Sequence, residues 1–244
     1  MTTDALRGRV AVVTGASRGI GRAIALMLGS HGVKVAAAAR TDADLRAVCD
    51  DIAGHGGEAT PVCTDMTSEE GVKRLVRTTV ERLGKLDIVI NNAGIGVFGP
   101  IEETATEDWD RVMAVNVRGA FILCREAIPH LRQNDGTTWI INICSVVGVK
   151  GYVNQAAYTA SKHALLGMTK VLAQEVQKDG IRVHAVCPGG VDTGLVAAAR
   201  PDLDRSVLMR PEEIAEIVLF LLTRQGNAVV DQINVRRAAS QPWW

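Results

Sequence analysis

Short apolar segments alternate with longer, amphipathic segments along most of the chain. Several of the short segments are apolar nearly throughout, which is typical of strands buried on both faces of a parallel sheet. We predict strands at Val10–Thr14, Val33–Ala38, Ala59–Cys63, Leu86–Asn91, Trp139–Ile143, Ile181–Cys187 and Val229–Asn234.

The longer segments carry helical signals. The sequence Thr67-x-x-Glu70 has the form of a capping box, and Gly84 is placed to end the helix that follows. Pro211 suits the first position of another helix, where the backbone needs no N–H. Further helices are expected at Ala43–Ala53 behind an Asp42 cap, from near Thr106 through Phe121, and at Asn154–Lys178.

Seven strands that alternate with about six helices imply right-handed βαβ crossovers. The expected fold class is therefore α/β, a Rossmann-like doubly wound, seven-stranded parallel sheet flanked by helices on both faces. The 244 residues contain no internal repeat and no Pro/Ser-rich linker. We therefore expect one domain over 1–244, with tails at about 1–8 and 238–244.

Charge and composition narrow the function classes. The 27 Lys and Arg residues balance 27 Asp and Glu residues, which argues against nucleic acid or an anionic membrane as a partner. No apolar run reaches the roughly 18 residues that span a bilayer, and Met1–Arg9 lacks the apolar core of a signal peptide. The five cysteines are scattered, which favours reduced thiols in a cytoplasmic protein. The histidines form no cluster with metal-ligand spacing, so no metal site is expected.

A glycine-rich segment follows the first predicted strand and opens a helix. Its sequence, Thr14-Gly-Ala-Ser-Arg-Gly-Ile-Gly21, has the spacing Gly-x-x-x-Gly-x-Gly. Glycine lets the backbone turn tightly and approach a pyrophosphate, whose charge then lies at the helix N-terminus. A simple strand-to-helix turn also uses glycine, but the position at the first βα junction favours a dinucleotide site. The residues expected to contact the dinucleotide are Gly15, Ser17, Arg18, Gly19, Ile20 and Gly21.

Arg40 indicates which dinucleotide is bound. An NAD site typically carries an acid about 20 residues past the last glycine, where it binds the ribose. Here the second predicted strand ends without an acid and Arg40 follows, with a guanidinium that suits a ribose 2′-phosphate. Arg18 offers a second positive group. We expect NADP (NADPH) rather than NAD; the alternative is that Arg40 is merely solvated and Asp42 binds the ribose.

Tyr158 and Lys162 lie four residues apart on a predicted helix, so they share one face. A phenol titrates near pH 10, and a nearby ammonium lowers this pKa, as proton transfer near neutrality requires. Ser145 follows a buried strand, and strand ends are where α/β sheets bind ligands. Each of these features alone is more typical of a surface pair or a turn than of a catalytic site.

Taken in chain order, these motifs resemble the short-chain dehydrogenase/reductase family, in particular single-domain members similar to 3-oxoacyl-carrier-protein reductases. The resemblance covers about residues 8–222, most of the chain. The residues that carry it are Thr14–Gly21, Asn91–Gly94, Asn116, Ser145, Tyr158, Lys162 and Pro188–Thr193.

The resemblance implies a hydride-transfer enzyme in which Tyr158 protonates a carbonyl oxygen while NADPH delivers the hydride. Lys162 would lower the pKa of Tyr158 and hold the nicotinamide ribose, and Ser145 would orient the carbonyl. Asn116 would hold a water that links Lys162 to solvent. Further cofactor contacts are implied for Asp65 and Met66 at the adenine, Asn92, Ala93 and Gly94 at the ribose, and Pro188, Gly189, Val191 and Thr193 at the nicotinamide.

The expected function is thus an NADP(H)-dependent oxidoreductase acting on a small-molecule or acyl-thioester carbonyl, with a 3-oxoacyl thioester as the first candidate. The alternatives are an NAD-dependent alcohol or sugar dehydrogenase and a catalytically silent nucleotide-binding sensor. The complete set of proton-transfer residues disfavours the sensor. The segment Gly194–Arg210 is expected to cover the substrate, and its arginines could meet an acidic carrier protein.

The resemblance also implies a homo-oligomer, a tetramer or a dimer. It is weakest at the C-terminal end, where many relatives have Asp-Gly-Gly and this chain has Val235-Arg236-Arg237. The terminal Trp243 and Trp244 suit either docking onto a neighbouring subunit or a disordered tail.

Overall fold

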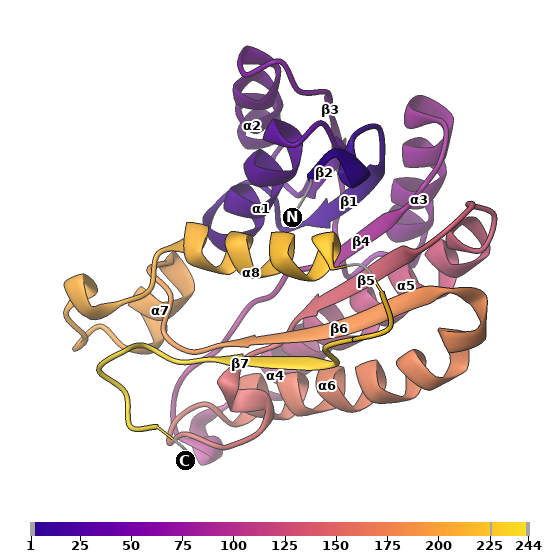
Figure 1. The fold of residues 1–244 in the computed structure, drawn as a ribbon. Helices are drawn as coiled ribbons and strands as arrows, with labels where there is room; N and C mark the ends of the chain where they lie inside the picture. The colour runs from indigo at the N-terminus through magenta and orange to yellow at the C-terminus, as the bar shows by residue number, and fades with distance from the viewer. Residues whose placement is uncertain (1–2, 225, 243–244) are drawn as a thin grey trace.

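A computed structural model describes residues 3–224 and 226–242 as helices packed around one seven-stranded sheet (Figure 1). All strand pairs are parallel, and the strand order is β3-β2-β1-β4-β5-β6-β7. The strands are β1 Val10–Thr14, β2 Lys34–Ala39, β3 Ala59–Cys63, β4 Ile88–Asn91, β5 Thr138–Ile143, β6 Ile181–Pro188 and β7 Gln232–Val235. This architecture confirms the predicted Rossmann-like fold, and it gathers the carboxyl ends of the strands at one edge.

Helices connect the strands. They are α1 Gly19–Ser30, α2 Asp42–Gly54, α3 Glu69–Leu83, α4 Thr106–Met113, α5 Gly119–Leu131, α6 Ala156–Val176, α7 Gly194–Ala199 and α8 Pro211–Thr223. In the described part of the chain, none of the helices is long and apolar enough to span a bilayer.

Two apolar cores form on opposite faces of the sheet. α1, α2 and α8 pack on one face, and α3, α5 and α6 on the other (Figure 1). Along β1, Ala11 and Val13 join the first core, whereas Val12 joins the second. Burial on both faces explains why this strand is apolar at successive positions.

Two predicted helix starts are wrong by one residue. Ser68, not Thr67, caps α3, because its Oγ accepts a hydrogen bond from the Gly71 N–H at 3.0 Å. Asp42 is the first residue of α2 rather than its cap, and its carboxylate pairs with Arg46 at 2.6 Å. The predicted stop at Gly84 is confirmed, since this residue adopts the left-handed conformation that ends α3.

The helix predicted to run from Thr106 through Phe121 is interrupted. Between α4 and α5 the chain forms a π-helical segment, Ala114–Arg118, which contains Asn116. A π turn widens a helix locally and re-aims side chains, and such turns are frequent at functional sites.

The ends of the chain also depart from the prediction. The strand expected at Val229–Asn234 begins later, at Gln232, because Val229 is 47% exposed and lies outside the ladder with β6. Leu6, expected in a tail, is fully buried. Trp243 and Trp244 lie outside the described residues.

Candidate active site

The glycine-rich loop forms a close-fitting turn at the carboxyl end of β1. Gly15 has a positive φ of 65°, and a Cβ on it would lie 2.8 Å from the side-chain amide of Asn92. A Cβ on Gly21 would collide with the carbonyl oxygen of Gly15. The turn therefore requires glycine at both positions, and no side-chain hydrogen bond caps the start of α1.

Thr14 and Asn92 fasten this loop to the end of β4. Thr14 Oγ1 accepts hydrogen bonds from the backbone N–H groups of Asn92 at 3.0 Å and Ala93 at 3.1 Å. The Asn92 amide donates in return to the carbonyl oxygen of Thr14 at 2.8 Å. The segments Thr14–Gly21 and Asn92–Gly94, far apart in sequence, thus form one rigid surface.

Arg18 and Arg40 are exposed near this surface, after β1 and β2 respectively. Neither forms an ion pair within residues 3–224 and 226–242. Asp42, the alternative ribose ligand, is instead engaged by Arg46. Asp65 is exposed after β3, but the Met66 side chain is only 7% exposed and packs in the core beneath α5.

The proton-transfer residues predicted from the sequence meet between β5 and α6. The Ser145 side chain lies beside the Tyr158 phenol and favours its ionised form. Ser145 Oγ also donates to the carbonyl oxygen of Pro188 at 3.3 Å, which ties β5 to the end of β6. The Lys162 Nζ lies 5.8 Å from the centroid of the Tyr158 ring and donates to the Ile143 carbonyl at 2.9 Å.

The pKa of Tyr158 moves in the direction opposite to the prediction. Burial raises the pKa of Tyr158 to about 12, and the nearby Cys144 acts in the same direction, although the Ser145 side chain favours the phenolate. Burial also lowers the pKa of Lys162. The expected lowering of the Tyr158 pKa by Lys162 is wrong for this structure. The Lys162 ammonium bonds to the Ile143 carbonyl, and the desolvation of the Tyr158 phenolate is larger than the remaining effects.

Asn116 clamps the loop after β4. Its amide accepts from the Ile95 N–H at 2.8 Å and donates to the Ile95 carbonyl at 2.9 Å and to Ser161 Oγ at 2.9 Å. A Cβ on Gly94 would lie 3.4 Å from Asn116 Oδ1 and 3.6 Å from Lys162 Nζ. Asn116 and Lys162 therefore meet at Gly94. The partner residue Ser161 gave no signal in the sequence.

The segment after β6 lies beside the glycine loop. A Cβ on Gly19 would lie 3.1 Å from Thr193 Cγ2, and Thr193 caps α7 by accepting from the Val196 N–H. Val191 is buried and forms a bridge with Met209. The structure thus brings the predicted pyrophosphate and nicotinamide segments into contact.

Apolar side chains surround Tyr158. Phe98 meets its ring edge-on at 5.9 Å, and Val146, Val147 and Leu195 complete the cluster. Because Leu195 belongs to α7, the segment Gly194–Arg210 does reach the candidate catalytic residues.

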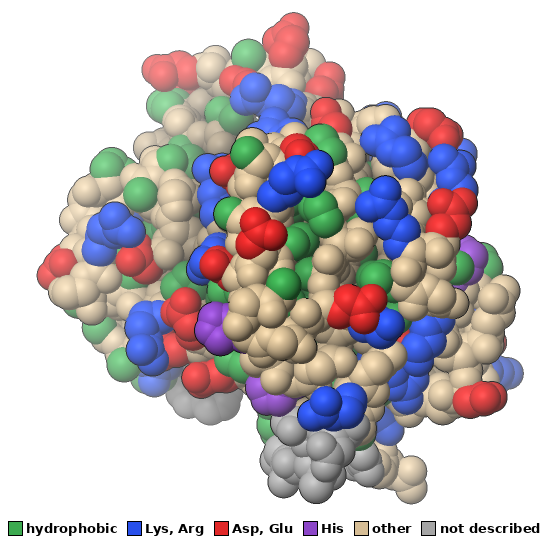
Figure 2. Space-filling model, turned by 90° about the horizontal axis from the view of Figure 1, so that it is seen from above, with side chains coloured by type: hydrophobic (Ala, Val, Ile, Leu, Met, Phe, Trp, Pro, Cys, Tyr) green, Lys and Arg blue, Asp and Glu red, His purple; other side chains and the backbone are tan. Residues whose placement is uncertain are grey.

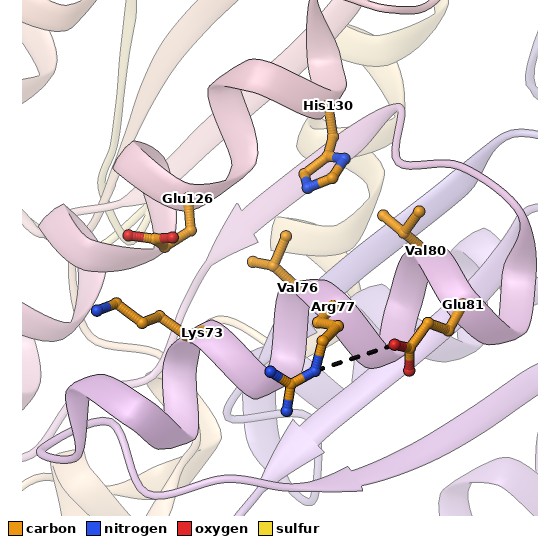
Figure 3. A pocket seen from close by; sticks show the side chains of 7 residues that line it. All are labelled: Lys73, Val76, Arg77, Val80, Glu81, Glu126 and His130. Atoms are coloured by element: carbon orange, nitrogen blue, oxygen red, sulfur yellow. Dashed lines mark ion pairs between the residues drawn. The ribbon is translucent and has the colours of Figure 1, made fainter.

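Two hollows open on the surface. One, of about 350 Å³, runs between α3 and α5, and its lining includes the Arg77–Glu81 ion pair but none of the predicted site residues (Figure 3). The other, of about 270 Å³, lies in the segment that follows β6, between Asp192 and Leu208. Basic and acidic side chains are mixed across the face shown in Figure 2, in line with the zero net charge.

Comparison with known proteins decides the family. Residues 9–204 match the profile of the short chain dehydrogenase family. The chain belongs to this family. Its curated relatives include the 3-oxoacyl-[acyl-carrier-protein] reductase FabG of Thermotoga maritima, which is 34% identical over 237 residues, 93% of this chain and 96% of that protein.

Solved structures of short-chain dehydrogenases show the same fold. A metagenomic short-chain oxidoreductase in complex with NADP is 35% identical, with a TM-score of 0.84 over 97% of this chain and 100% of that chain. The 3-ketoacyl-(acyl-carrier-protein) reductase of Brucella melitensis, complexed with NADH, is 32% identical, with a TM-score of 0.87 over 95% and 98% of the two chains. The chain is therefore an oxidoreductase of a family that includes nicotinamide-dependent members.

Proposed function

We propose that this short-chain dehydrogenase is an NADP(H)-dependent carbonyl reductase, able to act in reverse as an alcohol dehydrogenase. The observation that carries the proposal is the meeting of Ser145, Tyr158 and Lys162 at the carboxyl edge of the sheet, beside the segments Asn92–Gly94 and Pro188–Thr193. A silent nucleotide sensor would have no need for this arrangement.

The chain's own residues supply the proton and the geometry. With a pKa of about 12, the Tyr158 phenol is protonated at neutral pH, so it is ready to donate to a carbonyl oxygen. Ser145 is placed to hold that oxygen beside the phenol. Lys162 uses one of its three donors on Ile143 and has others for ribose hydroxyls. The bound nicotinamide supplies the hydride.

The residues present fit a nicotinamide dinucleotide, and they favour NADP. The turn at Gly15 and Gly21 forms a cradle that a Cβ would fill, and the first turn of α1 carries no acid. Arg18 and Arg40, which have no ion pair in the described part of the chain, suit a 2′-phosphate. Asp42, which would favour NAD, is held by Arg46.

A 3-oxoacyl thioester is the first substrate candidate, because relatives such as FabG of Thermotoga maritima carry that activity in their names. The apolar cluster of Phe98, Val146, Val147 and Leu195 around Tyr158 suits the hydrocarbon part of such a substrate or of a simple ketone.

The experiment is NADPH oxidation against a panel of carbonyl compounds that includes acetoacetyl thioesters, with NADH in parallel. We expect turnover with NADPH. In Arg40→Ala the preference for NADPH over NADH in kcat/KM should fall by about 10- to 100-fold, the range for losing a charge-assisted hydrogen bond. Arg77→Ala on α3 is the control, because this arginine lines a hollow that contains none of the predicted site residues. Silence across the panel would overturn the reductase, and an unchanged preference would overturn the NADP assignment.

A further inference from the structure

The arginines of the covering segment are already neutralised by acids of the same chain. Arg200 pairs with Asp202 at 2.7 Å, and Arg205 pairs with Asp192 at 2.7 Å. Arg210 lies 3.9 Å from Glu213. These pairs leave little positive charge at this side of the site for an acidic carrier protein.

Arg237 differs from these residues in its position. It follows β7, whose last residue accepts a hydrogen bond from the Gly189 N–H at 2.7 Å. A Cβ on Gly190 would lie 3.3 Å from Cδ and 3.4 Å from Nε of Arg237, and 3.0 Å from Cδ2 of Leu208. The Arg237 side chain therefore crosses the turn that begins at Pro188, the residue to which Ser145 donates.

Arg237 also differs in its partners. It is partly buried, and its guanidinium has no hydrogen bond or ion pair with any residue of 3–224 or 226–242. A guanidinium without an anion among the described residues keeps its donors available for an anionic ligand.

The neighbouring Arg236 holds the backbone on which Arg237 stands. Its Nη1 donates to the carbonyl oxygens of Arg237, Ala238 and Ser240 at 3.1, 3.0 and 2.9 Å. These bonds fold the segment after β7 back on itself, so Arg237 is carried on an ordered turn and directed to Gly190.

We propose that Arg237 binds a carboxylate of the substrate, so that this enzyme reduces oxo acids, small ketones that carry a free carboxylate. The inference rests on the proposed carbonyl reductase activity and assigns its substrate class. A single guanidinium matches a carboxylate in charge and in its forked, two-donor geometry, whereas a phosphate dianion would keep an excess negative charge at this site. Arg237 contacts Gly190, two residues past the Pro188 carbonyl to which Ser145 donates, so an anion bound by Arg237 would lie on the substrate side of this turn.

The test compares acetoacetate, levulinate and 5-oxohexanoate, each with its methyl ester, as substrates for NADPH oxidation. In the wild-type enzyme we expect at least one acid to exceed its ester in kcat/KM. In Arg237→Met that acid should lose about 10- to 100-fold, mainly through KM, while its ester is unchanged, and Arg237→Lys should recover part of the loss. Arg210→Met, which removes one positive charge from the exposed start of α8, is the control and should leave the ratio of acid to ester as it is.

Two results overturn the inference while the reductase stands. One is a wild-type preference for the methyl ester over the free acid in all three pairs. The other is an acid-to-ester ratio that Arg237→Met leaves unchanged. If no carbonyl compound is reduced at all, the proposed function itself is wrong and the inference is wrong with it.

Discussion

The Tyr158 phenol is shielded from water. It is packed against Phe98, Val146 and Val147, and burial is the largest cause of its raised pKa. A protonated phenol is the form that a carbonyl reduction consumes, whereas alcohol oxidation needs the phenolate. The ligand-free enzyme therefore holds Tyr158 in the protonated form that carbonyl reduction consumes.

Titration of the tyrosines tests this environment. The chain has only two tyrosines, so the difference in ultraviolet absorbance between wild type and Tyr158→Phe isolates Tyr158. We expect its phenolate to form near pH 12 in the ligand-free protein, as far as circular dichroism shows the fold intact. The folded state keeps a proton that the unfolded chain loses near pH 10, so stability should fall between about pH 10 and 12. A midpoint below pH 9 would contradict this.

At the residue scale, the sequence predicted which side chains meet but not how they are oriented. Spacing on one helix was enough to place Tyr158 beside Lys162. This spacing could not show that the Lys162 ammonium bonds to the Ile143 carbonyl. The predicted direction of the shift in the Tyr158 pKa was therefore wrong. Arg237 was visible only as a departure from the family pattern, because its contact with Gly190 depends on the pairing of β6 with β7.

At the scale of elements, strand cores were predicted well because burial on both faces gives a continuous apolar signal. β1 and β3 have their predicted bounds. Helix starts were less certain, since Thr67 and Ser68 are both good caps and local sequence does not choose between them. The π-helical segment around Asn116 had no sequence signal, since its apolar pattern resembles that of a regular helix.

Substitutions at the start of α3 test whether Ser68, rather than Thr67, caps this helix. Ser68→Ala should lower the free energy of unfolding by about 1 kcal/mol, because the Gly71 N–H loses its acceptor. For a chain of this size that corresponds to a fall in Tm of roughly 2–4 °C. Thr67→Ala, one residue away, should change stability by less than about 0.5 kcal/mol. A larger loss in Thr67→Ala than in Ser68→Ala would restore the cap inferred from the sequence.

At the scale of the whole molecule, the alternation of strands and helices was enough to predict the doubly wound sheet. It could not predict which surfaces remain apolar. Trp109 on α4, Phe121 on α5 and Val171 on α6 are 38%, 47% and 56% exposed. We propose that a second copy of the chain covers these helices.

Light scattering measures how many copies of the chain assemble. The wild-type mass should be a multiple of the 26.0 kDa chain, two or four copies, and the double variant Phe121→Glu, Val171→Glu should lower it towards a single chain. The two introduced glutamates should oppose burial of this surface against a second copy. They should leave the core of the chain intact, since Phe121 and Val171 are both exposed. A wild-type monomer, or a variant that assembles normally, would remove the proposal.

The central claim, that the site transfers hydride to a carbonyl with Tyr158 as the proton donor, is tested most directly by isotope transfer. NADPH carrying deuterium at both C4 positions is incubated with the best carbonyl substrate, and the alcohol is analysed by mass spectrometry. We expect an alcohol with one deuterium on the former carbonyl carbon, formed about 100- to 10,000-fold more slowly by Tyr158→Phe at unchanged NADPH affinity. An alcohol without deuterium, or a Tyr158→Phe variant as fast as wild type, would contradict it.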